Sequence, residues 1–440
     1  MFASLGPNPD RRRWTGRFSS ALILIPLLAA AVGCSVAPAN PTPSASPVTA
    51  SPASIVPGGS APDRTESAVD PTAVPLPTTS TGWSRVPAQA SVAGVQLQRI
   101  IWTGARFVGI GVARDADGTA ILDSPDGVTW SRQAAFGTNQ LPAALAAGPH
   151  GVLAVLAGDD HVAAWTSPDG LTWTVREDAF PGPTADGASG GPIRFTVRDI
   201  VATETGWLAV GRVDPVCQLD CGTDPVRPLV WTSRDGSTWT AQDEVGEPRG
   251  GMNAVARTGD GFVAVGLGRS RAAVWTSGDG STWSPVADAP LLHALPGADP
   301  SSWVEMIGVA AADGVIVAVG MDGPQGGGDN SIRAWSSRDG RTWSDATGES
   351  FAGGQAFAVT ATRAGFLLVG PQVTSRCLGG MWESADGRSW TCVASDAAFA
   401  GFGPYAVASS PALVVAVGLD SSGPDSDDGV PGTVWIKRIG

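Results

Sequence analysis

The chain has 440 residues and a formal net charge of -13, with 58 glycines, 35 prolines and 17 tryptophans. Abundant turn residues, many tryptophans and sparse charge are typical of an all-β protein. The acidic balance argues against binding to nucleic acid, because phosphate backbones are bound through clustered basic residues. We therefore predict no nucleic-acid partner.

Residues 1–33 have the pattern of an export signal. Arginines precede the apolar run ALILIPLLAAAV at 21–32, which is too short to span a bilayer and has the length of a signal-peptide core. The next residues, AVGC, end at Cys34 and resemble the lipobox of bacterial lipoproteins, with Ala31 in place of the usual leucine. The resemblance implies a lipid anchor on Cys34 and a protein exported to a bacterial cell surface or periplasm. An ordinary signal peptide with a chance cysteine is the alternative.

Residues 34–80 are rich in proline, serine, threonine and alanine, with almost no large apolar side chains. Such a segment buries too little surface to offset its ordering entropy, so we predict a semi-extended tether. The folded domain is then expected over 81–440.

A short apolar string rich in valine recurs seven times, at 106–111, 151–156, 206–211, 261–266, 315–320, 365–370 and 413–418. Each string reads as a strand buried on both faces. A strand-like run precedes each one, and a tryptophan box with an Asp-Gly turn follows most of them and predicts a hairpin. Four strands repeated seven times predict an all-β, seven-bladed β-propeller. A β-sandwich array is the alternative.

The seventh copy of the box is incomplete. GTVWIKRIG at 432–440 stops halfway through the pattern, and TGWSRVP at 81–87 has the look of the missing half. We predict that residues 82–87 pair with residues 432–438, which would close the ring and cover an exposed strand edge. A sandwich array does not predict this arrangement.

Six complete boxes have the form of WTSRDGSTW at 231–239. They resemble the Asp-box, or BNR repeat, of sialidases and related propellers, although the spacing from aspartate to glycine is one residue shorter. A carboxylate at this place can accept N–H groups of the turn, and the glycine can take a positive φ. We therefore predict a structural role, and not ligand binding, for Asp126, Asp169, Asp235, Asp279, Asp339 and Asp386.

Four cysteines remain besides Cys34. We predict two local disulfides, Cys217–Cys221 and Cys377–Cys392, which suit an oxidising compartment. A four-cysteine zinc site is the alternative, and it would require two pairs three repeats apart to meet.

Equivalent positions on the seven innermost strands, at a fixed distance before each apolar string, are expected to ring a central funnel. They are Gln98, Ala143, Arg198, Asn253, Ile307, Phe357 and Tyr405. The polar members, with Arg99, Asp199 and Glu305 close by, form our candidate ligand site on the face that carries the variable loops.

The sialidase resemblance implies arginines that bind a substrate carboxylate, a tyrosine nucleophile with a glutamate partner, and an acidic aspartate. Tyr405, Glu305, Asp199, Arg99 and Arg198 match this set in part, but no third inner arginine is evident. We therefore predict no catalytic residue, no cofactor and no metal site.

The function expected from the sequence is a non-catalytic binding or scaffold module for a glycan or a protein, held at the membrane by its lipid and acting as a monomer. One alternative is a glycoside hydrolase of the exo-α-sialidase type. A second alternative is an assembly factor for envelope or membrane complexes, because propellers host many functions.

Overall fold

The computed structural model describes residue 76 and residues 78–439, apart from 115–117, 137–139, 159–160, 184–193, 215–225, 243–244, 246–249, 295–301, 324–329, 371–376, 400 and 421–431. The predicted signal peptide, Cys34, the Cys217–Cys221 pair and nearly all of the predicted tether lie outside the described residues. In the described part of the chain, no helix is both long enough and apolar enough to cross a membrane.

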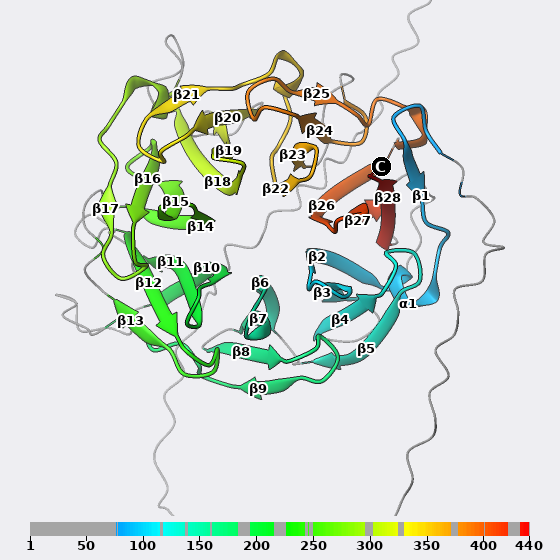
Figure 1. The fold of residues 1–440 in the computed structure, drawn as a ribbon, viewed down its shortest axis with the longest axis horizontal. Helices are drawn as coiled ribbons and strands as arrows, with labels where there is room; N and C mark the ends of the chain where they lie inside the picture. Colours follow the sequence, from blue (N-terminus) through cyan, green and yellow to red (C-terminus); the bar gives the residue numbers. More distant parts are fainter. Residues whose placement is uncertain are drawn as a thin grey trace, which may run out of the picture. The chain divides into compact units, whose positions relative to one another are not determined.

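Seven four-stranded antiparallel sheets follow one another around a common axis (Figure 1), which confirms the predicted seven-bladed β-propeller. Blade 1 consists of β2 (Val95–Trp102), β3 (Phe107–Ala113), β4 (Gly118–Ser124) and β5 (Ser131–Phe136). Blade 2 consists of β6 (Leu141–Gly148), β7 (Gly151–Ala157), β8 (Val162–Ser167) and β9 (Thr174–Arg176). Blade 3 consists of β10 (Arg194–Ala202), β11 (Trp207–Asp214), β12 (Arg227–Ser233) and β13 (Thr240–Gln242).

Blades 4 to 6 continue the pattern with short outer strands. Blade 4 consists of β14 (Gly251–Thr258), β15 (Gly261–Leu267), β16 (Ala272–Ser277) and β17 (Ser284–Pro285). Blade 5 consists of β18 (Trp303–Ala312), β19 (Val315–Gly323), β20 (Ser331–Ser337) and β21 (Trp343–Asp345). Blade 6 consists of β22 (Ala358–Thr362), β23 (Gly365–Val369), β24 (Met381–Ser384) and β25 (Thr391–Cys392). The described helices are single turns: α1 (Ala90–Ala93), η1 (Pro290–Leu292), η2 (Glu349–Phe351) and η3 (Ala397–Phe399).

The seventh blade combines strands from both ends of the domain. It contains β26 (Phe402–Ser409), β27 (Leu413–Asp420) and β28 (Gly432–Arg438), and its outermost strand is β1 (Trp83–Arg85). The register places Trp83 opposite Lys437 and Arg85 opposite Trp435. The predicted closure is therefore confirmed, with a strand shorter than the expected 82–87.

Side chains of neighbouring blades form the core. The second strand of each blade is buried on both faces, as its continuous apolar sequence predicts, and apolar clusters fill the spaces between blades. Trp83 and Trp435 of blade 7 lie fully or nearly fully buried in one such cluster together with Trp382 of blade 6. Burial of these rings stabilises the closed ring, because large aromatic side chains remove the most apolar surface from water.

The box turns are held by their aspartates. In each of the six boxes one carboxylate oxygen accepts the N–H groups of the second and third residues after it, at 2.7–2.9 Å. The glycine after each aspartate has φ between 69 and 78°. At Asp339 the N–H groups of Thr342 and Arg341 lower the carboxyl pKa to about 2, so the turn is held by a charged group.

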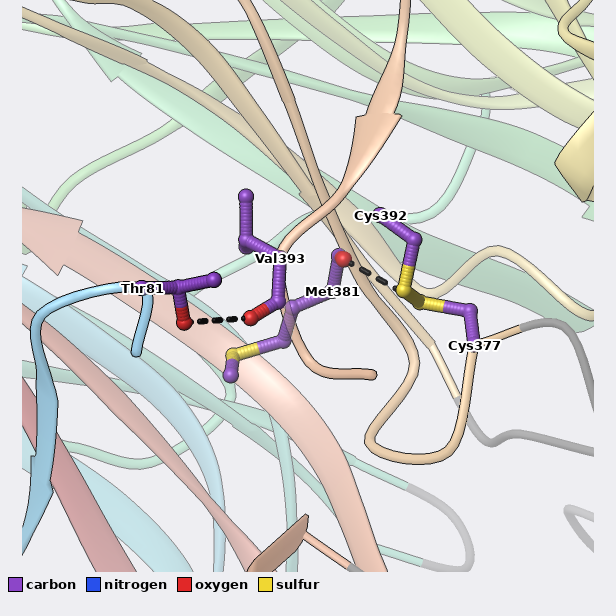
Figure 2. Close-up of a disulfide and its surroundings, with 5 residues drawn as sticks. All are labelled: Thr81, Cys377, Met381, Cys392 and Val393. Carbon is purple, nitrogen blue, oxygen red and sulfur yellow. Dashed lines mark hydrogen bonds between the residues drawn. A yellow bond between two sulfur atoms is a disulfide. The ribbon is translucent and has the colours of Figure 1, made fainter. Parts of the chain in front are cut away.

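A disulfide joins Cys377 to Cys392, with a Cα–Cα distance of 5.6 Å (Figure 2), and so confirms the predicted pair in blade 6. Cys392 ends β25, and the carbonyl of the next residue, Val393, accepts the hydroxyl of Thr81 at 2.6 Å. Thr81 lies two residues before β1. The disulfide-bonded edge of blade 6 therefore also holds the segment that closes blade 7.

Candidate functional site: the central funnel

The innermost strands share a β-bulge at one position. In six blades the pairing with the second strand skips one residue, and the skipped residues are Gln98, Ala143, Arg198, Asn253, Ile307 and Tyr405. In blade 6, Phe357 occupies the same place just before β22 and donates its N–H to Val369 at 2.8 Å. A bulge turns the side chain of the unpaired residue away from the ladder. All seven residues are half-buried, although their immediate neighbours are mostly buried.

A glycine at the end of the second strand accompanies the bulge in five of the six bulged blades. A Cβ on Gly266 would lie 1.9 Å from the Gly251 carbonyl, and one on Gly320 would lie 1.8 Å from the Glu305 carbonyl. In blades 4 and 5 only a residue without a side chain permits this approach. The recurring Val-Gly at the end of the apolar strings is thus a sequence signal for the bulges, which sequence reasoning missed. Blade 2 has Leu156 at this place and is the exception.

One arc of the funnel is aromatic. Phe357 of blade 6 and Tyr405 of blade 7 stack with ring centroids 5.1 Å apart and an interplanar angle of 24°. Gln96 of blade 1 hydrogen-bonds the tyrosine and accepts Arg114 Nη2 at 3.2 Å. Burial raises the pKa of Tyr405, against the opposing effects of Arg114 and Gln96. The phenol therefore stays protonated and can donate a hydrogen bond.

Blades 3 and 5 contribute charged groups. Burial raises the pKa of Glu305 on blade 5, and the positive charges of Arg198 and Arg212 on blade 3 partly offset this rise. Arg212 belongs to the second strand, which is why counting along the innermost strands did not find it. Its signal is a charged residue directly after a string that is otherwise apolar. The three groups bring two cations and one carboxylate together.

Three of the predicted site residues also bridge neighbouring blades. Arg99 donates from Nη2 to the Ala143 carbonyl at 3.2 Å, joining blades 1 and 2. Asn253 donates from Nδ2 to the Met306 carbonyl at 2.9 Å, joining blades 4 and 5. These contacts give the inner ring a polar component besides its apolar packing.

Asp199 is the third bridging residue. Its Oδ2 accepts the N–H of Val255 in blade 4 at 2.9 Å, and its Oδ1 accepts the N–H of Ile200 at the same distance. Burial raises the pKa of Asp199 to about 6, although the two N–H groups and the charge of Arg99 favour the ionised form. Desolvation lowers the pKa of Arg99, and the negative charge of Asp199 partly offsets this fall.

The structure separates two members of the partial sialidase set, Tyr405 and Glu305. In the described part of the chain no hydrogen bond joins Tyr405 to Glu305: Tyr405 interacts with Phe357, Gln96 and Arg114, and Glu305 lies near arginines of blade 3. Among the described residues, no three His, Cys, Asp or Glu side chains gather as a metal site requires.

No protein-family model and no curated protein matches the sequence. Among solved structures, the chain is similar to a Trypanosoma rangeli sialidase bound to the inhibitor DANA, with 13% identity and a TM-score of 0.44 over 82% of this chain. It spans 60% of the length of that sialidase. It is also similar to the Bacillus subtilis arabinanase Arb43A, with 11% identity and a TM-score of 0.35 over 81% of this chain and 96% of that one. A third similar structure is Zg3597, a family 117 glycoside hydrolase of Zobellia galactanivorans, with 10% identity and a TM-score of 0.34 over 81% of this chain and 89% of that one. At these values the likeness does not bear on the site.

Proposed function

We propose that this propeller is a non-catalytic binding module that takes a glycan in its central funnel. The observation that carries the proposal is the bulge that six blades share at one position of the innermost strand, because a bulge re-aims the side chain of its unpaired residue. The blades form a rigid scaffold, and the side chains that they present differ from blade to blade. Such an arrangement favours recognition of one ligand shape.

The chemistry of the funnel suits a sugar. Phe357 and Tyr405 offer an apolar aromatic face, and Gln98 and Asn253 lie on the other blades with amide groups. A pocket with one apolar wall and a few placed polar groups orients a ligand that has an apolar face and hydroxyl groups. A protein partner would contact the wider loop face instead of this central set.

Two features of the reactive groups support binding without turnover. Both oxygens of Asp199 accept backbone N–H groups, which fixes the carboxylate as a structural bridge. Tyr405 has a raised pKa, whereas a tyrosine nucleophile needs an adjacent base to remove its proton. These features support a binding role over nucleophilic catalysis.

We further propose that the protein is exported and held at a bacterial membrane by a lipid on Cys34, and that it acts as a monomer. The Cys377–Cys392 disulfide supports this location, because disulfides persist in oxidising compartments outside the cytoplasm. The tether over 34–80 would let the propeller reach ligands away from the membrane surface.

A glycoside hydrolase of the sialidase type is the second candidate. The raised pKa values of Asp199 and Glu305 favour it, because a general acid in such an enzyme must hold its proton near neutral pH. The two candidates differ in whether the ligand is consumed.

The test uses the detergent-solubilised full chain with a glycan array and with fluorogenic glycosides, a sialoside among them. We expect retention of a glycan without turnover, and loss of retention in Phe357→Ala and Arg198→Gln. If wild type hydrolyses a glycoside and both Tyr405→Phe and Glu305→Gln lose this activity, the protein is a hydrolase and not a binding module. If Phe357→Ala and Arg198→Gln both retain the glycan as wild type does, the ligand does not bind in the funnel.

A further inference from the structure

A groove of about 980 Å³ lies between blades 3 and 4, at the opposite ends of the strands from the funnel. Its walls are the box turns of the two blades and the turns that follow β10 and β14. The funnel residues Arg198 and Asn253 lie toward the other ends of the same two strands. The groove is therefore separate from the site described above.

Two glycines of blade 4 leave the groove open. A Cβ on Gly259 or on Gly278 would meet no atom within 4 Å, and both residues are exposed. Gly278 occupies the position between serine and aspartate in its box. The equivalent residues of the other five boxes all carry side chains: Pro125, Pro168, Arg234, Arg338 and Ala385.

The groove is lined by hydroxyl groups. Thr232, Thr240 and Thr258 all line it, and their side chains make no hydrogen bond within the part of the chain that the structure describes. The two aromatic residues at the floor, Trp207 and Phe262, are only 2% and 8% exposed, so they offer no stacking surface. A ligand of this groove must be recognised by hydrogen bonds and not by apolar contact.

The charges of the groove disfavour an anionic ligand, because four carboxylates and two arginines line it. Asp235 and Asp279 are tied to their own turns, and Asp260 adds a further carboxylate. At the rim, Arg257 of blade 4 pairs with Glu204 of blade 3 at 2.6 Å, which neutralises one of the two arginines present. The remaining surface is polar and acidic.

We propose that this groove is a second binding site, which takes a neutral oligosaccharide. Sugar hydroxyls both donate and accept hydrogen bonds, as the threonine hydroxyls do, so the two surfaces are complementary without charge. The size of the groove lies at the upper end of the range of ligand sites, which suits several linked sugar units. This proposal is independent of the function proposed for the funnel.

The test fills the groove with a large side chain at Gly278. Gly278→Arg places in blade 4 the residue that blades 3 and 5 already have at this position, so the fold should tolerate it. Pro125→Arg makes the same change in the box of blade 1 and is the matched control. Both variants are prepared in the full chain, and equal melting temperatures show that both are folded.

Binding is measured by calorimetry against neutral gluco-, xylo- and manno-oligosaccharides, with uronic-acid oligomers as the charged comparison. We expect wild type and Pro125→Arg to bind one neutral class equally, with a loss of at least tenfold in Gly278→Arg and in Thr240→Val/Thr258→Val. Hydrogen exchange should slow at residues 257–261 when the ligand binds. Failure of wild type to bind any neutral class overturns the proposal, as does equal binding by Gly278→Arg.

Discussion

Lys437, the chain's sole lysine, donates to both carboxylate oxygens of Glu383, at 2.7 and 2.9 Å. Lys437 belongs to β28 of blade 7, and Glu383 belongs to β24 of blade 6. Lys437 also stands opposite Trp83 in the closing pair of strands. One ion pair therefore joins the blade that closes the ring to the blade before it.

Breaking this pair should weaken the closed ring by a modest amount. The side chains are 27% and 35% exposed, so solvent screens the interaction. We expect Lys437→Met or Glu383→Gln to cost about 0.5–1 kcal/mol, in the range measured for partly exposed pairs. Urea unfolding of both variants and the double variant gives the coupling energy. Strict additivity of the two changes would show that the pair contributes nothing.

Trp83→Ala should destabilise the domain far more. Trp83 is fully buried in the core of blades 5 to 7, and its removal empties a large site. We expect a loss of about 3–5 kcal/mol in the free energy of unfolding. The control is Trp173→Ala, at the same box position in blade 2, where the ring is half-exposed and the loss should be smaller. Equal losses would contradict a special role of closure.

The disulfide of blade 6 should stabilise the ring beyond its own loop. Cys377 and Cys392 enclose a loop of 15 residues, for which the chain-entropy model gives about 3 kcal/mol. Cys377→Ser/Cys392→Ser should lower the melting temperature and make it insensitive to reductant. Val393 also holds Thr81, which lies just before β1, and β1 pairs with the strand that contains Lys437. Loss of the disulfide should therefore loosen β1 and speed the acylation of Lys437, as measured by mass spectrometry. Unchanged acylation would confine the disulfide's effect to blade 6.

Asp199 should give the protein a distinct pH dependence. Its pKa is raised from 3.8 to about 6 in the folded state, so the folded protein binds a proton more tightly than the unfolded chain does. The free energy of unfolding contributed by this group should therefore fall as the pH rises from about 4 to about 6. Asp199→Asn removes this slope, so its stability relative to wild type should improve between pH 4 and pH 7. Parallel curves for wild type and variant, with the exposed Asp260→Asn as control, would contradict the raised pKa.

The glycine of the bulge offers a structural test of the funnel. A Cβ on Gly320 would press against the Glu305 carbonyl, so Gly320→Ala should cost about 1–3 kcal/mol and displace the bulge residue Ile307. In Gly403→Ala the added atom meets nothing within 4 Å, which makes it the matched control. Thermal unfolding compares the two. Equal stability of both variants would mean that the bulge of blade 5 tolerates a side chain, as the bulge of blade 2 does with Leu156.

The sequence predicted the blades and the closure because both depend on repetition. Each apolar string and each Asp-Gly turn recurs, so a single missing half at Trp435 was enough to locate its partner at Trp83. Counting by repeat also located the bulge positions, although the bulge itself went unrecognised. The reason is that a bulge changes pairing and not hydropathy.

The arrangement within the funnel could not be predicted in the same way. That Arg99 interacts with Asp199 and Arg198 with Glu305 depends on contacts between blades that share no local sequence. The groove between blades 3 and 4 was missed for a similar reason. The sequence signal of the groove is the glycine at position 278. This glycine opens a groove only because two separate blades meet beside it.

The closing strand also sets an order of events for biosynthesis. Arg85, which lies in β1, contacts Thr433 from 348 positions away, so blade 7 cannot form until β28 has been synthesised. Such distant contacts form slowly, and the earlier blades must wait as an unsealed arc with an exposed strand edge. Synthesis of β28 therefore completes the seventh blade and the ring in a single step.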